Sequence, residues 1–185
     1  MKHLGTQTLE TERLILRRFR LEDAQAMFDN WASDPVVTKY LTWPTHENIG
    51  LTAMVIKDWV EGYVSDAHYK WAITLKDGDD RPIGDISVVR FDERVDAAEI
   101  GYCMGKAWWG KGLMTEALRA VIGYLIGQVG MNRVCAQHDA RNIGSGRVMQ
   151  KCGMRYEGTL RQAARNNVGI CDICSRSILA EEWNK

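Results

Sequence analysis

Three segments in which apolar and polar side chains alternate follow one another between residues 68 and 104, and this alternation is typical of β-strands. The segments are HYKWAITL (68–75), IGDISVVRF (83–91) and AAEIGYCM (97–104). Only KDGDDRP and DERVD separate them, and the first of these linkers contains Asp77-Gly78, a frequent turn sequence. Because strands joined by such short turns pair antiparallel, we expect two hairpins that form one antiparallel sheet.

The segments on either side alternate between helix and strand patterns. Before the three strands we expect a strand at 13–19, a helix at 22–32, a short helix within 36–41 and a longer helix that Thr45 caps and that runs to Tyr63. After them we expect a helix from Leu113, a strand at 132–139, a helix at 143–152, and strands at 154–162 and 170–179. No repeat or shift in composition divides the chain, so this order predicts one α+β (mixed α/β) domain over residues 1–185.

The charges of the chain are balanced, with 24 Lys plus Arg, 24 Asp plus Glu and no run of five like charges. This balance argues against a nucleic acid or an acidic membrane surface as a partner. The N-terminus lacks the apolar core of a signal peptide, and no apolar run approaches the roughly 20 residues of a membrane span. We therefore expect a cytoplasmic protein.

The five cysteines, at positions 103, 135, 152, 171 and 174, are expected to be reduced thiols. Cys171 and Cys174 have the spacing of half of a metal site. The sequence contains no second pair of this kind, and residues three apart in a strand point to opposite faces. We therefore expect no bound metal.

The segment AWWGKGLMTEAL (107–118) leads into a strongly amphipathic helix. Gly110 and Gly112 keep side chains off the backbone on both sides of Lys111, at a point where the first N–H groups of the helix have no partner within it. Such a helix start binds anions, above all phosphate, although a glycine-rich turn of purely structural role has the same sequence. The phosphate-loop motif of nucleotide hydrolases needs Ser or Thr after the lysine, and the dinucleotide motif needs Gly where this chain has Thr115. Both of these nucleotide motifs are therefore excluded.

The same segment resembles the acetyl-CoA-binding loop of the GNAT N-acetyltransferase superfamily, in which Gln or Arg, two residues, Gly, one residue and Gly or Ala open a helix. Trp109, Gly112 and Met114 occupy the three defined positions, so the first and the last depart from the commonest form. NIGSGRVMQKCGMRYEG (142–158) is similar to the family's Asn-x-x-Ser segment, and AEIGYCM (98–104) to its Glu-Ile-Gly-Tyr strand. TERLILRRFRLEDAQAM and ILAEEW match as well, in the right order. The chain looks most like the RimJ/RimL-type branch, which acetylates the N-termini of ribosomal proteins.

The resemblance implies a splayed, mostly antiparallel, seven-stranded mixed sheet flanked by helices, with acetyl-CoA between the fourth and fifth strands. It implies that the pantetheine arm lies along the fourth strand and that the diphosphate lies on the amides of the glycine loop. The cofactor-binding residues implied in this way are Cys103, Met104, Trp109, Gly110, Lys111, Gly112, Leu113, Met114, Thr115, Asn142 and Ser145. A backbone N–H near Cys103 or Met104 would bind the carbonyl oxygen of the thioester.

Transfer of an acetyl group needs a neutral amine, donors for the carbonyl oxygen, and a proton or hydrogen bond for the departing thiolate. By resemblance, Ser145 serves the thiolate and Glu99 activates the amine through water. Each residue also has a structural interpretation. Asn142 is a good helix N-cap with Ser145 three positions later, and Glu99 fits an ordinary solvent-facing strand position.

Rim-type relatives carry a further glutamate at the position that matches Ala164 here. A protein α-amine, with a pKa near 8, is about one-tenth neutral at pH 7, whereas roughly one in 2,500 lysine-like amines is neutral. A weak base therefore suffices for an α-amine. Tyr102 and Tyr156 are further candidate proton carriers, although tyrosines at such positions are more often core residues.

The sequence thus predicts an acetyl-CoA-dependent N-acetyltransferase that moves the acetyl group directly to a primary amine, with a protein N-terminal α-amine as the expected acceptor. Two alternatives stay open. The acceptor could be a small-molecule amine, such as a polyamine or an aminoglycoside-like drug, or the chain could be a catalytically silent acyl-CoA-binding domain. The resemblance also admits a homodimer, because relatives are often dimers.

Overall fold

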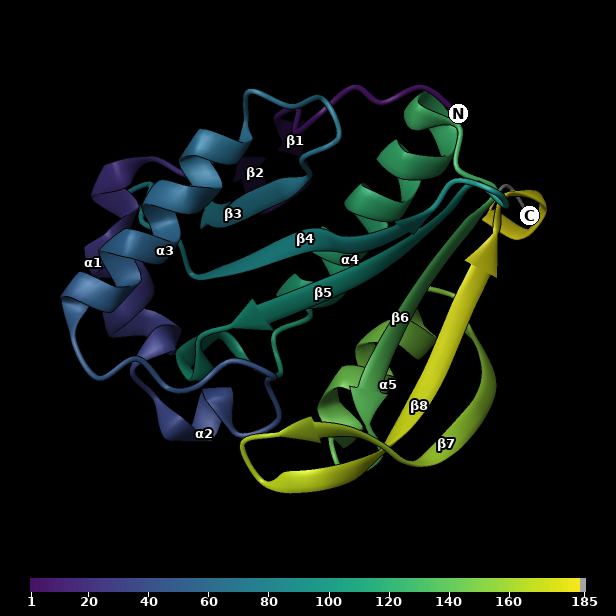
Figure 1. Cartoon of the computed structure of the whole chain (residues 1–185). Helices are drawn as coiled ribbons and strands as arrows, with labels where there is room; N and C mark the ends of the chain where they lie inside the picture. Colours follow the sequence, from purple (N-terminus) through teal and green to yellow (C-terminus); the bar gives the residue numbers. More distant parts are fainter. Residues whose placement is uncertain (184–185) are drawn as a thin grey trace.

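The computed structural model describes residues 1–183, which are built around an eight-stranded sheet (Figure 1). The strands lie in the order β1-β2-β3-β4-β5-β6-β8-β7. Their bounds are Leu9–Glu10 (β1), Leu14–Arg17 (β2), Lys70–Leu75 (β3), Gly84–Asp92 (β4), Ala97–Met104 (β5), Arg133–Asp139 (β6), Arg155–Asn166 (β7) and Gly169–Leu179 (β8). Only β5 and β6 pair in parallel among these strands, so the sheet is mixed and mostly antiparallel, as predicted.

Helices cover both faces of this sheet, with α1 and α3 over one face and α4 and α5 over the other (Figure 1). The α-helices are Ala24–Met27 (α1), Pro35–Thr38 (α2), Ile49–Gly62 (α3), Leu113–Tyr124 (α4), Ile143–Lys151 (α5) and Ala180–Trp183 (α6). Short 3-10 segments span Leu21–Asp23 (η1) and Lys106–Trp108 (η3), and π-helical segments span Phe28–Ala32 (η2) and Leu125–Val129 (η4). Within residues 1–183, none of the helices combines the length and the apolar character that a membrane crossing needs.

The structure differs from the sequence prediction in the number of strands, in the cap of one helix and in the length of β7, which runs to Asn166 rather than to residue 162. The sheet has eight strands rather than seven, because the short β1 pairs with β2, and two residues are too few to show an alternating pattern. Helix α3 is capped by Asn48 rather than by Thr45. The Asn48 Oδ1 atom accepts the Leu51 N–H at 3.0 Å, whereas the Thr45 hydroxyl lies 2.6 Å from the hydroxyl of Thr38.

Strand β5 separates two hydrophobic clusters. Ala98, Ile100 and Met104 belong to the cluster that contains the buried side of α4, while Cys103 belongs to the cluster formed by the first helices around Trp31. The buried residues of α4 recur three or four positions apart, which explains its amphipathic sequence. Both faces of β5 are therefore covered, and this fixes the strand's position.

Strands β5 and β6 separate part-way along their length (Figure 1). Their parallel pairing covers residues 97–100 of β5 and 133–136 of β6, although β5 continues to Met104 and β6 to Asp139. Each strand keeps its other neighbour over its whole length, β4 for β5 and β8 for β6. The facing backbone edges beyond residues 100 and 136 therefore have no strand partner.

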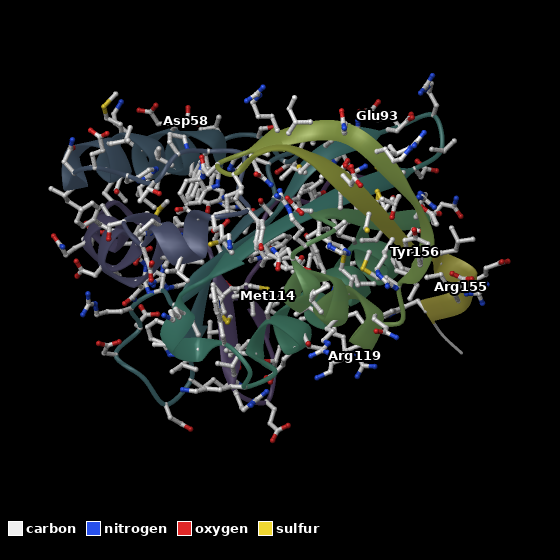
Figure 2. The ribbon with its side chains drawn as sticks, turned by 90° about the horizontal axis from the view of Figure 1, so that it is seen from below. Asp58, Glu93, Met114, Arg119, Arg155 and Tyr156 are labelled. Atoms are coloured by element: carbon white, nitrogen blue, oxygen red, sulfur yellow. The ribbon has the colours of Figure 1, made fainter. Side chains whose placement is uncertain are left out.

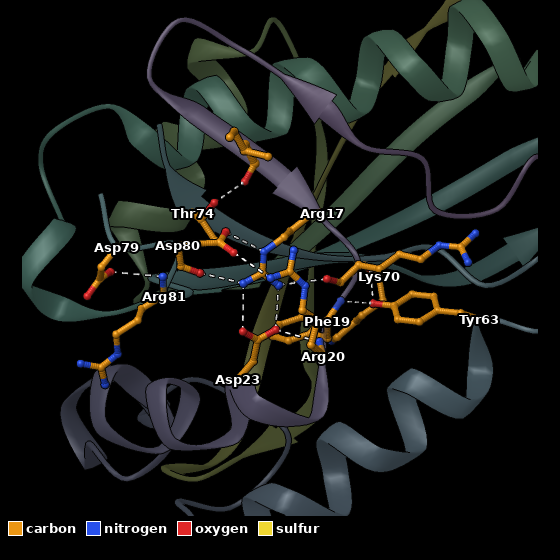
Figure 3. A network of polar contacts seen from close by, with 12 residues as sticks. Arg17, Phe19, Arg20, Asp23, Tyr63, Lys70, Thr74, Asp79, Asp80 and Arg81 are labelled. Atoms are coloured by element: carbon orange, nitrogen blue, oxygen red, sulfur yellow. Dashed lines mark hydrogen bonds and ion pairs between the residues drawn. The ribbon is translucent and has the colours of Figure 1, made fainter. Parts of the chain in front are cut away.

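A buried ion pair fixes the path from β2 into the first helical segment (Figure 3). Arg17 donates to both carboxylate oxygens of Asp23, at 2.8 and 2.9 Å, and these side chains are only 8% and 7% exposed. Its Nε also donates to Asp80, in the turn between β3 and β4, at 2.8 Å. Partial burial acts to raise the pKa of Asp80, but hydrogen bonds and charge from Arg17 and Arg20 lower it overall. Arg17 thus joins three separate segments.

Arg17→Met should lower the free energy of unfolding by about 3–5 kcal/mol, because it leaves the Asp23 carboxylate buried without its arginine. Arg20→Met is the matched control. Arg20 also binds Asp80, but it is 59% exposed, and loss of such a surface pair costs at most about 1 kcal/mol. Urea unfolding of the two variants measures both free energies of unfolding. An equal decrease in the two variants would show that the buried Arg17–Asp23 pair stabilises the fold no more than the exposed Arg20–Asp80 pair.

Candidate active site

The loop before α4 presents backbone rather than side chains. Gly110 and Gly112 have φ angles of +74° and +78°, in the left-handed region that favours glycine. Gly112 is the N-cap residue of α4, so no side chain caps the helix, and a Cβ atom there would lie 3.6 Å from Arg13 Nη2. The N–H groups at the start of α4, among them that of the half-buried Thr115, therefore meet no capping side chain, and helix starts of this kind bind anions.

An ion pair from the segment before β2 holds this loop in place. Arg13 binds Glu116, in the first turn of α4, with an Nη2–Oε2 distance of 2.6 Å, and its Nη1 donates to the Lys111 carbonyl at 3.0 Å. The Thr11 hydroxyl donates to the other Glu116 oxygen at 2.6 Å. Partial burial acts to raise the pKa of Glu116, but the hydrogen bonds from Thr11 and Arg13 lower it overall. No local sequence pattern predicts this contact, because it joins residues 103 positions apart.

The apolar side chains of the loop point into the protein. Leu113 and Met114 are only 4% and 7% exposed and belong to the main core, and Figure 2 shows Met114 near the middle of the molecule. These two residues can therefore offer a cofactor only their backbone. Trp109 is 46% exposed, and its indole N–H donates to the Met104 carbonyl at 2.6 Å, which ties the loop to the end of β5. The side chain of Lys111 is exposed.

Cys103 and Met104 lie on the part of β5 that has no β6 partner. Their side chains are buried in the two different cores, so the backbone edge is the part that faces β6. Burial raises the pKa of the Cys103 thiol well above its usual value. A buried, protonated thiol is a poor nucleophile, so Cys103 is not suited to carry an acyl group.

Ser145 lies in the first turn of α5 and contacts both Asn142 and Tyr102. The Asn142 Oδ1 atom accepts the Ser145 N–H at 3.2 Å and caps the helix. The Ser145 Oγ atom lies 2.9 Å from the hydroxyl of Tyr102, on the part of β5 that has no β6 partner, and that hydroxyl also donates to the Ser145 carbonyl at 3.0 Å. The capping interpretation of Asn142 therefore holds, and the same cap places the serine hydroxyl beside β5. Tyr156, the other candidate proton carrier, is 55% exposed and contacts Thr159 instead.

Glu99 lies on the paired part of β5 and is bound by an arginine. Its Oε2 atom accepts from Arg90 Nη2 at 2.6 Å, and the glutamate side chain is 16% exposed against 71% for the arginine. Because side chains alternate along a strand, Glu99 and Tyr102 point to opposite faces of β5. The structure thus does not bring Glu99 and Ser145 together: the two candidates flank the diverging strands from opposite faces.

The β7–β8 hairpin reaches back to the first helices (Figure 1). At its tip, the Asn167 side chain donates to the carbonyls of Thr38 and Trp43, at 2.9 and 2.8 Å. The neighbouring Asn166 donates to the Asp139 carboxylate, at the end of β6, at 2.7 Å. No local sequence pattern predicts these contacts, because the segment Asn166-Asn167-Val168-Gly169 indicates only a turn.

The remaining sequence candidates lie in the same hairpin. Ala164 pairs with Cys171 and offers no carboxylate. Cys171 lies 3.4 Å from the amide nitrogen of Asn166, while Cys174 lies 3.1 Å from the Thr159 hydroxyl, so the two thiols have different surroundings. Over residues 1–183, no group of three or more His, Cys, Asp or Glu side chains is arranged to hold a metal ion.

Comparison with known proteins identifies this arrangement. The family model described as acetyltransferase (GNAT) domain matches residues 13–155. The N-acetyltransferase p20 of Bacillus licheniformis is 30% identical over 177 residues, which are 96% of this chain and 98% of that protein. The ribosomal protein uS5-alanine N-acetyltransferase of Escherichia coli (strain K12) is 29% identical over 165 residues, 81% of this chain and 79% of that protein. Among solved structures, the microcin C7 self-immunity acetyltransferase MccE, in complex with acetyl-CoA and AMP, has a TM-score of 0.81 at 23% identity and covers 91% of this chain and 93% of its own.

The matched residues include the glycine loop, the diverging strands and the segment from Asn142 to Ser145. Acetyltransferases of this family take the acetyl group from acetyl-CoA. The match covers most of the chain, and the chain therefore belongs to the GNAT family and is an acetyl-CoA-dependent N-acetyltransferase.

Proposed function

We propose that this enzyme acetylates the N-terminal α-amine of a protein. The observation that carries the proposal is that every acidic residue of strands β4 to β7 is ion-paired with a basic side chain. The pairs are Asp85–Lys70, Asp92–Arg94, Glu99–Arg90, Asp139–Arg141 and Glu157–Arg133. A polyamine, which carries several positive charges, would find no carboxylate without an ion pair on these four strands, and Asp172, the acidic residue of β8, accepts the Gln162 N–H at 2.8 Å. A chain terminus with one amine needs no such carboxylate.

The strength of the base points to the same class of acceptor. A carboxylate is in general a weak base toward an ammonium ion, and Arg90 Nη2 occupies one of the two Glu99 oxygens at 2.6 Å. About one-tenth of α-amines are neutral at pH 7, and a weak base that acts through water is then sufficient. The similarity to the ribosomal protein uS5-alanine N-acetyltransferase supports this acceptor as well.

The proposed reaction is a direct transfer. The neutral amine attacks the thioester carbon, and the oxygen that gains charge accepts a hydrogen bond from a backbone N–H near Cys103 or Met104. The C–S bond then breaks, and the thiolate accepts a hydrogen bond from Ser145 Oγ. The attacking nitrogen loses one proton to Glu99 through water. The products are the N-acetylated terminus and coenzyme A.

The acceptor can be identified by release of coenzyme A thiol. A peptide with a free N-terminus should react faster than an N-acetylated peptide that contains lysine, and faster than spermidine. Below pH 8 the rate should rise up to about tenfold per pH unit, because the neutral fraction of the α-amine rises in this way. Faster release with spermidine would overturn the proposed acceptor, and equal release without any amine would overturn the transfer.

Gly112→Glu should weaken acetyl-CoA binding by about 100-fold or more, since it places a negative charge where the diphosphate would lie on the N–H groups of α4. Isothermal titration measures this affinity. Gly127→Glu is the matched control, because Gly127 lies in η4, where a Cβ atom would meet nothing within 4 Å. Unchanged affinity in Gly112→Glu would exclude this loop as the phosphate site.

Ser145→Ala should lower kcat by about 10²- to 10³-fold with little change in the Kd for acetyl-CoA, if the hydroxyl stabilises the leaving thiolate. Thiol release at saturating substrates measures kcat, and titration measures Kd. The Asn142 side chain remains as the cap of α5 in this variant, so the helix should persist. A wild-type kcat in this variant would exclude the catalytic role of Ser145 and leave it only a structural role.

A further inference from the structure

The contact between Tyr102 and Ser145 joins one hydroxyl to two oxygens. The Tyr102 hydroxyl lies 3.0 Å from the Ser145 carbonyl oxygen and 2.9 Å from its Oγ. A tyrosine hydroxyl has one hydrogen, so it can donate fully to only one of these oxygens at a time. The carbonyl oxygen can only accept. When Tyr102 donates to the carbonyl, the hydrogen of Ser145 must therefore be the one that lies between the two hydroxyls.

A second arrangement exists at the same atomic positions. If Tyr102 donates to Oγ instead, the hydrogen of Ser145 becomes available to another acceptor. The carbonyl oxygen is not left without a donor, because a carbonyl in the first turn of an α-helix also accepts the N–H four residues later. The two arrangements differ only in the rotation of two hydroxyl hydrogens.

We propose that Tyr102 is a positioning residue for the leaving group: as the C–S bond breaks, its hydroxyl changes acceptor from the Ser145 carbonyl to Oγ, and the Ser145 hydrogen turns to the thiolate. This inference rests on the proposed role of Ser145. In this step the electron pair of the C–S bond stays on sulfur. Each hydroxyl hydrogen stays on its own oxygen, so only hydrogen bonds change.

The position of Tyr102 suits this role. Its backbone pairs with Ile86 of β4, on the part of β5 that has no β6 partner, so the hydroxyl is held between a strand and the start of α5. Burial raises the pKa of Tyr102, which keeps the hydroxyl neutral and a donor. The thiolate of coenzyme A, with a pKa of about 8.5, takes its proton from water after the transfer.

Tyr102→Phe tests the inference because it removes the hydroxyl and keeps the ring. The rate of thiol release in a single turnover should fall about tenfold, the value of one lost hydrogen bond, while the Kd for acetyl-CoA stays within about twofold of wild type. In the Ser145→Ala background the same substitution should cause no further fall, because no Oγ remains to be positioned.

Tyr124→Phe is the matched control. It also removes a buried hydroxyl, which donates to the Gly5 carbonyl at 2.7 Å. Tyr124 lies at the C-terminal end of α4, away from the glycine loop that precedes the helix. The free energy of unfolding should fall by a similar amount in Tyr124→Phe and Tyr102→Phe. Tyr124→Phe should keep the wild-type rate of thiol release. A slowing that came only from looser packing would appear in both tyrosine variants.

The outcomes separate this inference from the proposed role of Ser145. If Ser145→Ala keeps the wild-type rate, the role of Ser145 fails and the inference fails with it. If Ser145→Ala is slow but Tyr102→Phe slows both backgrounds equally, Tyr102 acts independently of Ser145 and only the inference is overturned. A wild-type rate in Tyr102→Phe overturns it as well.

Discussion

The separation of β6 from β5 after four paired positions is the constraint around which the rest of the structure is arranged. Backbone N–H and C=O groups in the interior need hydrogen-bond partners. The facing edges of β5 and β6, beyond residues 100 and 136, must therefore form these hydrogen bonds with a ligand or with water. The sheet tolerates the interruption because each strand keeps a full-length neighbour, β4 on one side and β8 on the other. An extended ligand such as a pantetheine arm can then supply the missing strand contacts.

Contacts between distant parts of the chain hold the segments around this interruption. Arg13 fixes the loop before α4 through Glu116 and the Lys111 carbonyl, and Asn167 fixes the β7–β8 hairpin through the carbonyls of Thr38 and Trp43. In the loop only Trp108 packs, partly buried, against the main core, and at the hairpin tip Val168 is 44% exposed. These polar contacts therefore help to fix both positions, and the proposed phosphate site depends in part on Arg13, which lies before β2.

The parts of this arrangement that follow local rules could be predicted from the sequence. The two hairpins, the amphipathic α4 that begins at Leu113 and the short α5 all have periodic patterns and clear end signals, and the structure contains them. The cap of α3 could not be chosen with certainty, because Thr45 and Asn48 are both good cap residues and only the backbone conformation decides between them. Arg13–Glu116 and Asn167–Trp43 could not be predicted, because a contact across a hundred residues leaves no local pattern.

With the proposed roles of Ser145 and Glu99, the alternation of side chains along β5 would place the leaving group and the acceptor on different faces of the sheet. Tyr102 and Ser145 lie on the face of α5, while Glu99 lies on the opposite face, and the acetyl group would lie between them. The leaving group and the acceptor are then handled by separate sets of residues. The two sets are connected, because Asn166 of the β7–β8 hairpin binds the Asp139 carboxylate and the Asp139 carbonyl accepts the Asn142 N–H at 2.8 Å. A change of acceptor that reshaped the hairpin would therefore reach the cap of α5 through Asp139.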